Sequence, residues 1–279
     1  MSQVGALVSA VVVDYHADDV LGGCIDSLRA NGIDDVVVVE NGAPGSTPPA
    51  LNGRTVTLVE PGLNLGYGRG VNRGAAETNA TPYLLVSNPD VVVHNGAVAT
   101  LLAALEGNTH CAVAGPKILR PDGSVYPSHR VFPNMVLAGL HALLAPLWPG
   151  NPATARYRSR HADGTVDWVS GACFLIRRDV FERIGGFDER YFMFAEDMAL
   201  CWEVAQAGFA VLAVDDAVVT HVEGVSRQRA TRSMVWAHHR SAFRFEAQRA
   251  KGWRKVFLPV AAAVLGVRML VVLGLRGRR

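Results

Sequence analysis

Near its start the sequence reads Val8-Ser9-Ala10-Val11-Val12-Val13-Asp14-Tyr15, an apolar and largely β-branched run that ends at a carboxylate and an aromatic ring. Such a run is typical of a strand that is buried on both faces of a sheet. A helical pattern closed by Gly32 follows over 20–31, and a second apolar run follows over 36–39. Strand and helix patterns alternate to about residue 115, which predicts an α/β fold with a mostly parallel sheet flanked by helices.

The same patterns predict the later elements. Residues 117–126 fit a hairpin around a Pro-Asp-Gly turn, and 127–165 fit loops because they hold many of the prolines. We expect further strands over 56–59, 83–87, 112–115 and 210–214, strand character over 166–177, and helices over 70–78, 96–106 and from about 196 to 207.

Composition excludes several classes of protein. The chain has 279 residues, 49% of them hydrophobic, so it can form a substantial core in one large domain or in one domain plus an appendage. A net charge of +2 gives no global signature of nucleic-acid binding. The four cysteines are far apart and form no Cys-x-x-Cys pair, so we expect neither a zinc site nor a disulfide framework, and a reducing compartment. The first apolar run lacks a preceding basic region and is interrupted by Asp14, so we do not expect secretion.

Polar side chains follow several of the predicted strands. Asp14, Glu40 and Asp90 each follow an apolar strand, and ligands of parallel α/β sheets bind at the carboxyl ends of the strands. In Asn88-Pro89-Asp90 the aspartate suits a hard cation such as Mg²⁺ or Mn²⁺ that also binds phosphate oxygens. A proline turn with an aspartate cap is the alternative interpretation. His221, after a late strand, either completes such a metal site or is structural.

A glycine-rich stretch leads into the helix predicted over 70–78. It reads Leu63-Asn64-Leu65-Gly66-Tyr67-Gly68-Arg69-Gly70-Val71-Asn72-Arg73-Gly74, which is neither a dinucleotide fingerprint nor a P-loop. Glycines let the backbone approach a ligand, and a helix N-terminus attracts phosphate. A contact to a diphosphate and a simple tight turn are about equally favoured by these residues alone.

Two adjacent carboxylates, Glu196 and Asp197, lie in an aromatic and apolar run at the start of a predicted helix. The helix dipole favours their ionised form, and an ionised carboxylate beside apolar walls suits a general base. A helix N-cap is the alternative.

The last segment is apolar over 256–275 apart from Arg268, and basic residues flank it. Its length is close to the ~20 residues that cross a bilayer, but a central arginine disfavours insertion by about 2.5–3.5 kcal/mol. An amphipathic helix on anionic lipid is therefore favoured over a membrane span or a buried helix.

Seven motifs in order together resemble the family-2 inverting glycosyltransferases of the GT-A fold, particularly their bacterial rhamnosyltransferase branch. The resemblance covers about residues 8–245. The motifs lie at 8–16, 37–42, 64–74 (Asn-Leu-Gly-Tyr-Gly-Arg-Gly-Val-Asn-Arg-Gly), 88–91 (Asn-Pro-Asp-Val), 171–178, 185–189 (Gly-Gly-Phe-Asp-Glu) and 196–197.

The resemblance implies a Rossmann-like GT-A domain over 1–245 and a membrane-associating helical tail over 246–279. Within the domain, about 1–115 would bind the nucleotide sugar, and 116–245 would bind the acceptor and carry the catalytic groups.

The resemblance also implies residue roles. Asp197 would be the catalytic base with Glu196 beside it, and Asp90 would hold the metal, with His221 as a candidate partner. Asn88 stands where the family's metal motif has an earlier acid, and we group it with the donor site. The other implied contacts are Asp14 and Glu40 to base and ribose, Asn64, Gly66, Arg69 and Asn72 to the nucleotide diphosphate, and Trp168, Gly171 and Ala172 to the acceptor.

The implied reaction moves L-rhamnose from dTDP-L-rhamnose to a polyprenyl-diphosphate N-acetylglucosamine, with Mg²⁺ or Mn²⁺, in cell-wall synthesis. We expect a peripheral enzyme at the cytoplasmic face of the plasma membrane, with no nucleic-acid partner and with a homodimer left open. The rivals are a transferase that uses a UDP-sugar for O-antigen, capsule or galactan, and a non-catalytic nucleotide-binding membrane scaffold. A dehydrogenase is disfavoured because residues 15–19 lack its glycine fingerprint.

Overall fold

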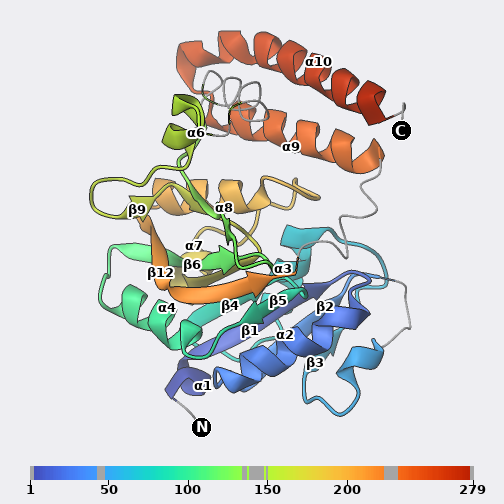
Figure 1. Ribbon diagram of the computed structural model, residues 1–279, viewed down its shortest axis with the longest axis vertical. Coiled ribbons are helices and arrows are strands. Elements are labelled where there is room, and N and C mark those ends of the chain that lie inside the picture. The colour runs from blue at the N-terminus through green and yellow to red at the C-terminus, as the bar shows by residue number, and fades with distance from the viewer. Residues whose placement is uncertain are drawn as a thin grey trace.

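The structure is a computed structural model, and it describes residues 3–42, 48–133, 137, 148, 150–222 and 232–276. Its strands form a curled central sheet with helices on both faces, which confirms the α/β class (Figure 1). Two long helices, α9 (Arg232–Arg249) and α10 (Leu258–Arg276), lie at the end of the molecule opposite the N-terminus.

The first half of the sheet is parallel, as the alternating pattern predicts. The strand order is β3-β2-β1-β4, and Asp14 at the end of β1 pairs in register with Glu40 at the end of β2. The elements of this half are α1 (Gln3–Leu7), β1 (Val8–Asp14), α2 (Asp18–Ala30), β2 (Asp35–Glu40), η1 (Pro49–Leu51), β3 (Thr57–Val59), α3 (Tyr67–Ala75), β4 (Tyr83–Ser87), β5 (Val91–Val93) and α4 (Ala97–Glu106).

Alternate residues of β1 enter different halves of the core, because successive side chains of a strand point to opposite faces. Ala10 and Val12 pack with the apolar sides of α2 and α4. Val11 and Val13 pack with α3 and with α8 (Glu196–Gln206) on the other face. The sheet is thus covered on both sides, and only its strand ends are open for polar groups.

The second half of the sheet is mixed. β11 (Cys173–Arg177) lies between β4 and β6 (Cys111–Leu119) and is antiparallel to both. β12 (Ala210–His221) runs parallel to β6, and β5 pairs antiparallel to the far part of β12. The prediction of mostly parallel pairing therefore holds for β1 to β4, and most of the later pairings are antiparallel.

Smaller elements complete the second half. The strand character over 166–177 divides into three strands, and the region taken as loops over 127–165 holds a strand and a helix. These elements are β7 (Val125–Tyr126), β8 (His129–Arg130), α6 (Pro152–Tyr157), β9 (Thr165–Val166), β10 (Trp168–Val169) and α7 (Arg178–Arg183), with β8 and β10 forming a separate two-stranded sheet.

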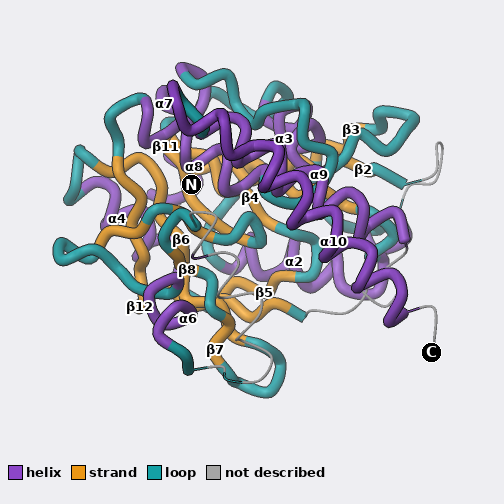
Figure 2. The backbone as a smooth tube through the Cα atoms, turned by 90° about the horizontal axis from the view of Figure 1, so that it is seen from above, coloured by secondary structure: helices purple, strands orange, loops and turns teal. Residues whose placement is uncertain are grey.

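The C-terminal helices form a hairpin through η2 (Gly252–Phe257), and α9 and α10 run side by side (Figure 2). Phe245 of α9 packs with Tyr191 and with Ala199 of α8. One face of α10 contacts α9 while its other face is exposed and apolar, including Val260, Val264, Val267 and Leu270.

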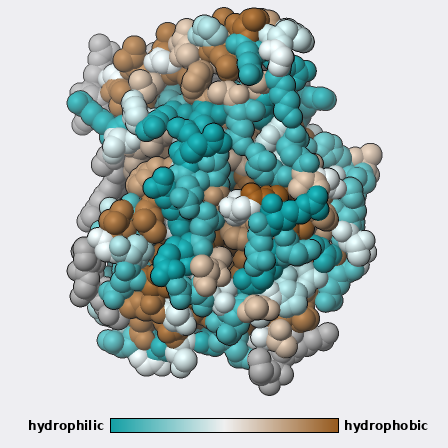
Figure 3. All heavy atoms as spheres, turned by 180° about the vertical axis from the view of Figure 1, so that it is seen from behind, coloured by the Kyte–Doolittle hydropathy of each residue, from teal (hydrophilic) through white to brown (hydrophobic). Residues whose placement is uncertain are grey.

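Residues 252–274 are long and apolar enough to cross a membrane, by length and composition, and little of this stretch is buried. Apolar side chains gather at the same end of the molecule in Figure 3. In this structure the tail is therefore not a buried core helix.

Candidate active site

The ends of β1 and β2 bring two carboxylates together. Asp14 and Glu40 are both buried and are neighbours in the strand register. Burial, and then hydrogen bonding to Glu40 and its charge, raise the pKa of Asp14 to about 8. A neutral Asp14 can donate one hydrogen bond and accept others, whereas an ionised one can only accept. Two residues further on, His16 has a φ of 54°, a left-handed conformation that only a few per cent of non-glycine residues adopt.

The glycine-rich stretch packs against the segment that precedes α8. Asn64 Oδ1 accepts a hydrogen bond from the Gly66 amide at 2.8 Å, and the Tyr67 amide donates to the Phe192 carbonyl at 3.1 Å. Gly66 has a φ of 83°, and a Cβ added there would lie 2.3 Å from the Phe192 carbonyl oxygen. Only glycine lets the two chain segments approach so closely.

Arg69 and Asn72 of α3 form hydrogen bonds with the backbone of the segment 187–189. Arg69 donates to the Glu189 carbonyl at 2.8 Å. Asn72 accepts from the Phe187 amide at 2.8 Å and donates to its carbonyl at 2.9 Å. In this structure both side chains position the 187–189 turn, and their contact with a nucleotide stays a prediction.

The sheet brings Asp90 and His221 together from segments 131 residues apart. Asp90 Oδ1 lies 2.9 Å from His221 Nε2, and Asn88 Nδ2 lies 3.5 Å from the same ring nitrogen. The other ring nitrogen, Nδ1, is buried without a hydrogen-bond partner among the described residues. No group of three or more His, Cys, Asp or Glu side chains within metal-binding reach occurs in the described part of the chain. One carboxylate and one imidazole still fit Mg²⁺ or Mn²⁺, because such ions take remaining ligands from substrate phosphates and water.

Glu196 and Asp197 begin α8, as the sequence predicts, and the backbone before them is unusual. Phe194 and Ala195 have φ values of 67° and 62°, so two consecutive non-glycine residues are left-handed. Such strain costs of order 1–3 kcal/mol per residue and is typical of functional sites. The N-cap residue Ala195 has no side chain that can cap α8, and the Asp197 carboxylate instead accepts a first-turn amide, that of Met198.

Asp197 is held by backbone donors. The Gly171 amide donates to its Oδ2 at 2.8 Å, and the Met198 amide donates to its Oδ1 at 2.8 Å. Burial raises the pKa of Asp197, although these two amides and the Arg130 charge oppose the rise. A carboxylate with a raised pKa is a stronger base than an exposed one while it remains ionised near neutral pH.

Glu196 is buried, and one of its oxygens, Oε2, has no hydrogen-bond partner among the described residues. Burial, and then the charge of Asp197, raise its pKa to about 8. Two adjacent carboxylates in one site do not both ionise easily, and the charge of Asp197 favours the protonated form of Glu196.

The segment 170–172 connects Asp197 to Asn88 through hydrogen bonds of its backbone. Gly171 donates to Asp197, and its carbonyl accepts from the Tyr67 hydroxyl at 2.5 Å. The Ala172 carbonyl accepts from the Asn88 amide at 2.8 Å. Gly171 and Ala172 thus lie beside both groups.

Trp168, for which an acceptor contact is predicted, is largely enclosed by neighbouring residues. Its ring is buried, its Nε1 donates to the Val131 carbonyl at 3.3 Å, and the Arg130 guanidinium lies 4.8 Å from its ring centre. The sequence interpretation missed Tyr67 and Arg130. Tyr67 was inside the quoted glycine-rich stretch, while Arg130 was in a region taken as loops and carried no signal.

Two solved structures share the fold. A mannosyltransferase from Pyrobaculum calidifontis, in complex with GDP-Man and Mn²⁺, aligns with a TM-score of 0.60 and 15% identity, over 95% of this chain and 74% of its own. GalNAc-T7 with UDP, GalNAc and Mn²⁺ aligns with a TM-score of 0.58 and 14% identity, over 87% of this chain and 52% of its own. The fold is therefore that of the GT-A glycosyltransferases.

The sequence defines the family. The model described as "Glycosyltransferase like family 2" matches residues 5–253, so the chain belongs to this family and is a glycosyltransferase. The N-acetylglucosaminyl-diphospho-decaprenol L-rhamnosyltransferase of Mycobacterium tuberculosis is 40% identical over 233 residues, which cover 78% of this chain and 76% of that protein. The rhamnosyltransferase WbbL of Escherichia coli is 26% identical over 168 residues, or 60% and 62% of the two chains.

Proposed function

We propose that the protein transfers L-rhamnose from dTDP-L-rhamnose to a polyprenyl-diphosphate N-acetylglucosamine, with inversion at the anomeric carbon. The 40% identity to the mycobacterial rhamnosyltransferase, over three quarters of both chains, carries this proposal. The adjacent carboxylates Glu196 and Asp197 at the start of α8 support the chemistry, since an inverting transfer needs one base and no enzyme nucleophile.

Asp197 takes the proton of the acceptor hydroxyl as that oxygen attacks the anomeric carbon. The bond between that carbon and the diphosphate oxygen breaks in the same displacement, and dTDP leaves. Two backbone amides fix both carboxylate oxygens of Asp197, so its basic lone pair is held in place before the acceptor arrives. A divalent metal bound by Asp90 and His221 would neutralise the charge on the departing diphosphate.

Asp14 and Glu40 bind the nucleotide base in this proposal. A pyrimidine ring presents a carbonyl, an N–H and a second carbonyl along one edge. A protonated Asp14 beside Glu40 offers both a donor and acceptors to that edge, which an ionised pair would not. Thymine and uracil share the edge, so these residues alone do not choose between dTDP and UDP.

The donor is tested by thermal unfolding with Mg²⁺ and either dTDP or UDP, followed by transfer from dTDP-L-rhamnose to a polyprenyl-diphosphate N-acetylglucosamine. A ligand at 100 times its Kd stabilises the folded state by ~2.7 kcal/mol, which raises Tm by several degrees. We expect dTDP to give the larger rise and rhamnose to be transferred. A larger rise with UDP, together with transfer from a UDP-sugar, would establish the rival donor class instead.

We also propose that the tail lies on the inner leaflet of the plasma membrane. Trp253 and Phe257 of η2 are exposed next to Lys251, Arg254 and Lys255, and such mixed aromatic and basic edges favour the surface of anionic membranes. The exposed apolar face of α10 continues this surface.

Deleting residues 251–279 is expected to move the protein from the membrane fraction to the soluble fraction, because the exposed apolar and basic groups of η2 and α10 are removed. Sedimentation with vesicles that contain anionic lipid measures this. A full-length variant with Val260, Val264 and Val267 changed to Asp should behave in the same way, whereas Val125→Asp, also at an exposed valine, should not. Membrane binding that survives both changes would contradict the proposal.

A further inference from the structure

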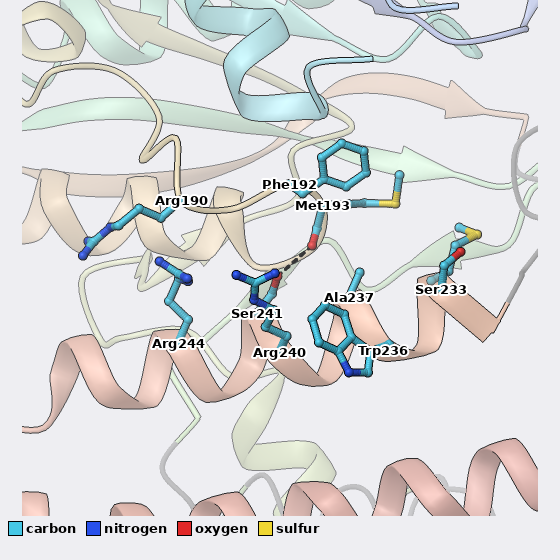
Figure 4. Close-up of a pocket in the computed structure, with 10 residues that line it drawn as sticks. Arg190, Phe192, Met193, Ser233, Trp236, Ala237, Arg240, Ser241 and Arg244 are labelled. Carbon is cyan, nitrogen blue, oxygen red and sulfur yellow. Dashed lines mark hydrogen bonds between the residues drawn. The ribbon is translucent and has the colours of Figure 1, made fainter. Parts of the chain in front are cut away.

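A cleft of about 260 Å³ lies between α9 and the segment 190–193, away from the groups assigned above (Figure 4). Its walls combine guanidinium groups with apolar side chains. The charged groups are Arg190, Arg240 and Arg244, and the apolar ones include Phe192, Met193 and Trp236.

Two of the three arginines are available to an anion. Arg190 already makes a close ion pair with Asp188 through its Nη2 at 2.5 Å. Arg240 and Arg244 make no ion pair with a carboxylate among the described residues within 4.0 Å, although Asp188 is near enough to Arg244 to feel its charge.

Arg240 and Arg244 each lie beside an aromatic ring. The Arg240 guanidinium lies 5.1 Å from the ring centre of Trp236, and that of Arg244 lies 5.8 Å from the ring centre of Tyr191. Contact with a ring uses the flat face of a guanidinium and leaves its N–H edge free. That edge matches the paired oxygens of a phosphate group.

The cleft is close to the catalytic base along the chain. Ser241 of α9 donates a hydrogen bond to the Met193 carbonyl at 2.9 Å, while the Tyr67 amide holds the carbonyl of Phe192. Asp197 follows Met193 by four residues, a distance that an extended chain covers in at most ~14 Å. One wall of the cleft therefore belongs to the segment that carries the base.

We propose that this cleft binds the diphosphate of the lipid-linked acceptor and its first isoprene units. Arg240 and Arg244 bind the diphosphate, and Trp236, Phe192 and Met193 contact the hydrocarbon. The inference rests on the proposed function, in which a single sugar ring separates the reacting hydroxyl from the diphosphate. Helix α10 packs on α9 on the side away from the cleft, and the apolar face of α10 that is turned away from α9 is exposed.

Binding is tested on the full-length protein with farnesyl diphosphate, in saturating dTDP so that the donor site is filled. Fluorescence of Trp236 reports the titration, and Trp236→Phe identifies its share of the signal. We expect Arg240→Gln and Arg244→Gln each to weaken binding about tenfold. Arg232→Gln removes the same charge from the exposed start of α9, outside the cleft, and should bind as the wild type does.

Farnesol contains only the isoprenoid half of the probe, and inorganic diphosphate contains only its charged half. Both should bind more weakly than farnesyl diphosphate, since each lacks one of the matching groups. Equal binding by farnesol, or unchanged binding in the Arg240 and Arg244 variants, would overturn the inference. Arg240→Lys keeps the positive charge but loses the paired N–H donors of the guanidinium. An affinity between those of the wild type and of Arg240→Gln would show that the cleft is still folded.

Kinetics distinguish failure of this inference from failure of the proposed function. If the wild type transfers rhamnose, the two glutamine variants should raise KM for the lipid acceptor about tenfold and leave KM for the donor unchanged. Transfer with an unchanged acceptor KM would reject the cleft but keep the function. No transfer, with farnesyl diphosphate still bound through Arg240 and Arg244, would reject the function but keep the anionic lipid site.

Discussion

Asp197→Asn is expected to lower kcat for sugar transfer by a factor of roughly 100 to 10,000, the contribution of a well-placed general base. The asparagine carbonyl can still accept the Gly171 hydrogen bond, so the site keeps its shape. The side-chain NH2 group of the new asparagine would face the Met198 backbone N–H, and the lost hydrogen bond costs about 1 kcal/mol of stability, which leaves the fold intact. Steady-state kinetics with the lipid acceptor measure kcat, and thermal unfolding checks the fold.

Glu196→Gln is the matched control. Because its raised pKa keeps Glu196 protonated at neutral pH, a neutral glutamine resembles the native side chain there, and most activity should remain. Wild-type kcat should fall as the pH is lowered through a range above that of an ordinary exposed carboxyl, because protonation removes the base and burial raises the pKa of Asp197. Retention of more than half the activity by Asp197→Asn would contradict the assignment.

Gly66→Ala is expected to destabilise the protein by roughly 3–4 kcal/mol and to impair catalysis as well. The added Cβ would lie 2.3 Å from the Phe192 carbonyl oxygen, and that oxygen also accepts the Tyr67 amide. The backbone at Phe192 must therefore move, and this movement reaches Glu196 and Asp197 through the left-handed residues Phe194 and Ala195. Chemical denaturation measures the free energy of unfolding.

Gly62→Ala is the control that separates the cost of a left-handed alanine from the cost of a steric clash. Gly62 has a φ of 77°, nearly that of Gly66, but a Cβ there would meet nothing within 4 Å. This variant should lose only the ~1–2 kcal/mol of a left-handed alanine and should keep its kcat. Equal losses in the two variants would show that the contact with Phe192 has no separate effect.

The N-terminal half was predictable because its strands are short apolar runs that each end at a polar group. The register of β1 with β2 places Asp14 opposite Glu40, and parallel strands bring their carboxyl ends to one edge without further information. The acid pair at the start of α8 was predictable for a similar reason, since the dipeptide stands at a clear change from loop to helix. Its roles as base and neighbour came from the resemblance rather than from the pattern.

The antiparallel entry of β11 was not predictable, because the long connection before it carries no signal of strand direction. Helix α9 was missed because its buried side includes the polar His239 and Ser241 beside Val235 and Phe245, so its apolar residues follow no clear helical period. Its packing also depends on Tyr191 from another segment. The sequence left two interpretations of His221 open, a partner of Asp90 in a metal site or a structural histidine. The approach of His221 to Asp90 results from the pairing of β12 with β5, a contact between residues far apart in the chain.

The position of β11 also determines when the protein can fold during synthesis. Until residue 177 has left the ribosome, β4 and β6 have no neighbour between them, and β4 offers an unpaired edge of backbone donors and acceptors. Contacts of such long sequence separation form slowly, because the loop must close first. A nascent chain of about 115 residues is therefore an incomplete sheet with an unpaired β4 edge, and intermediates of this kind are prone to wrong pairing.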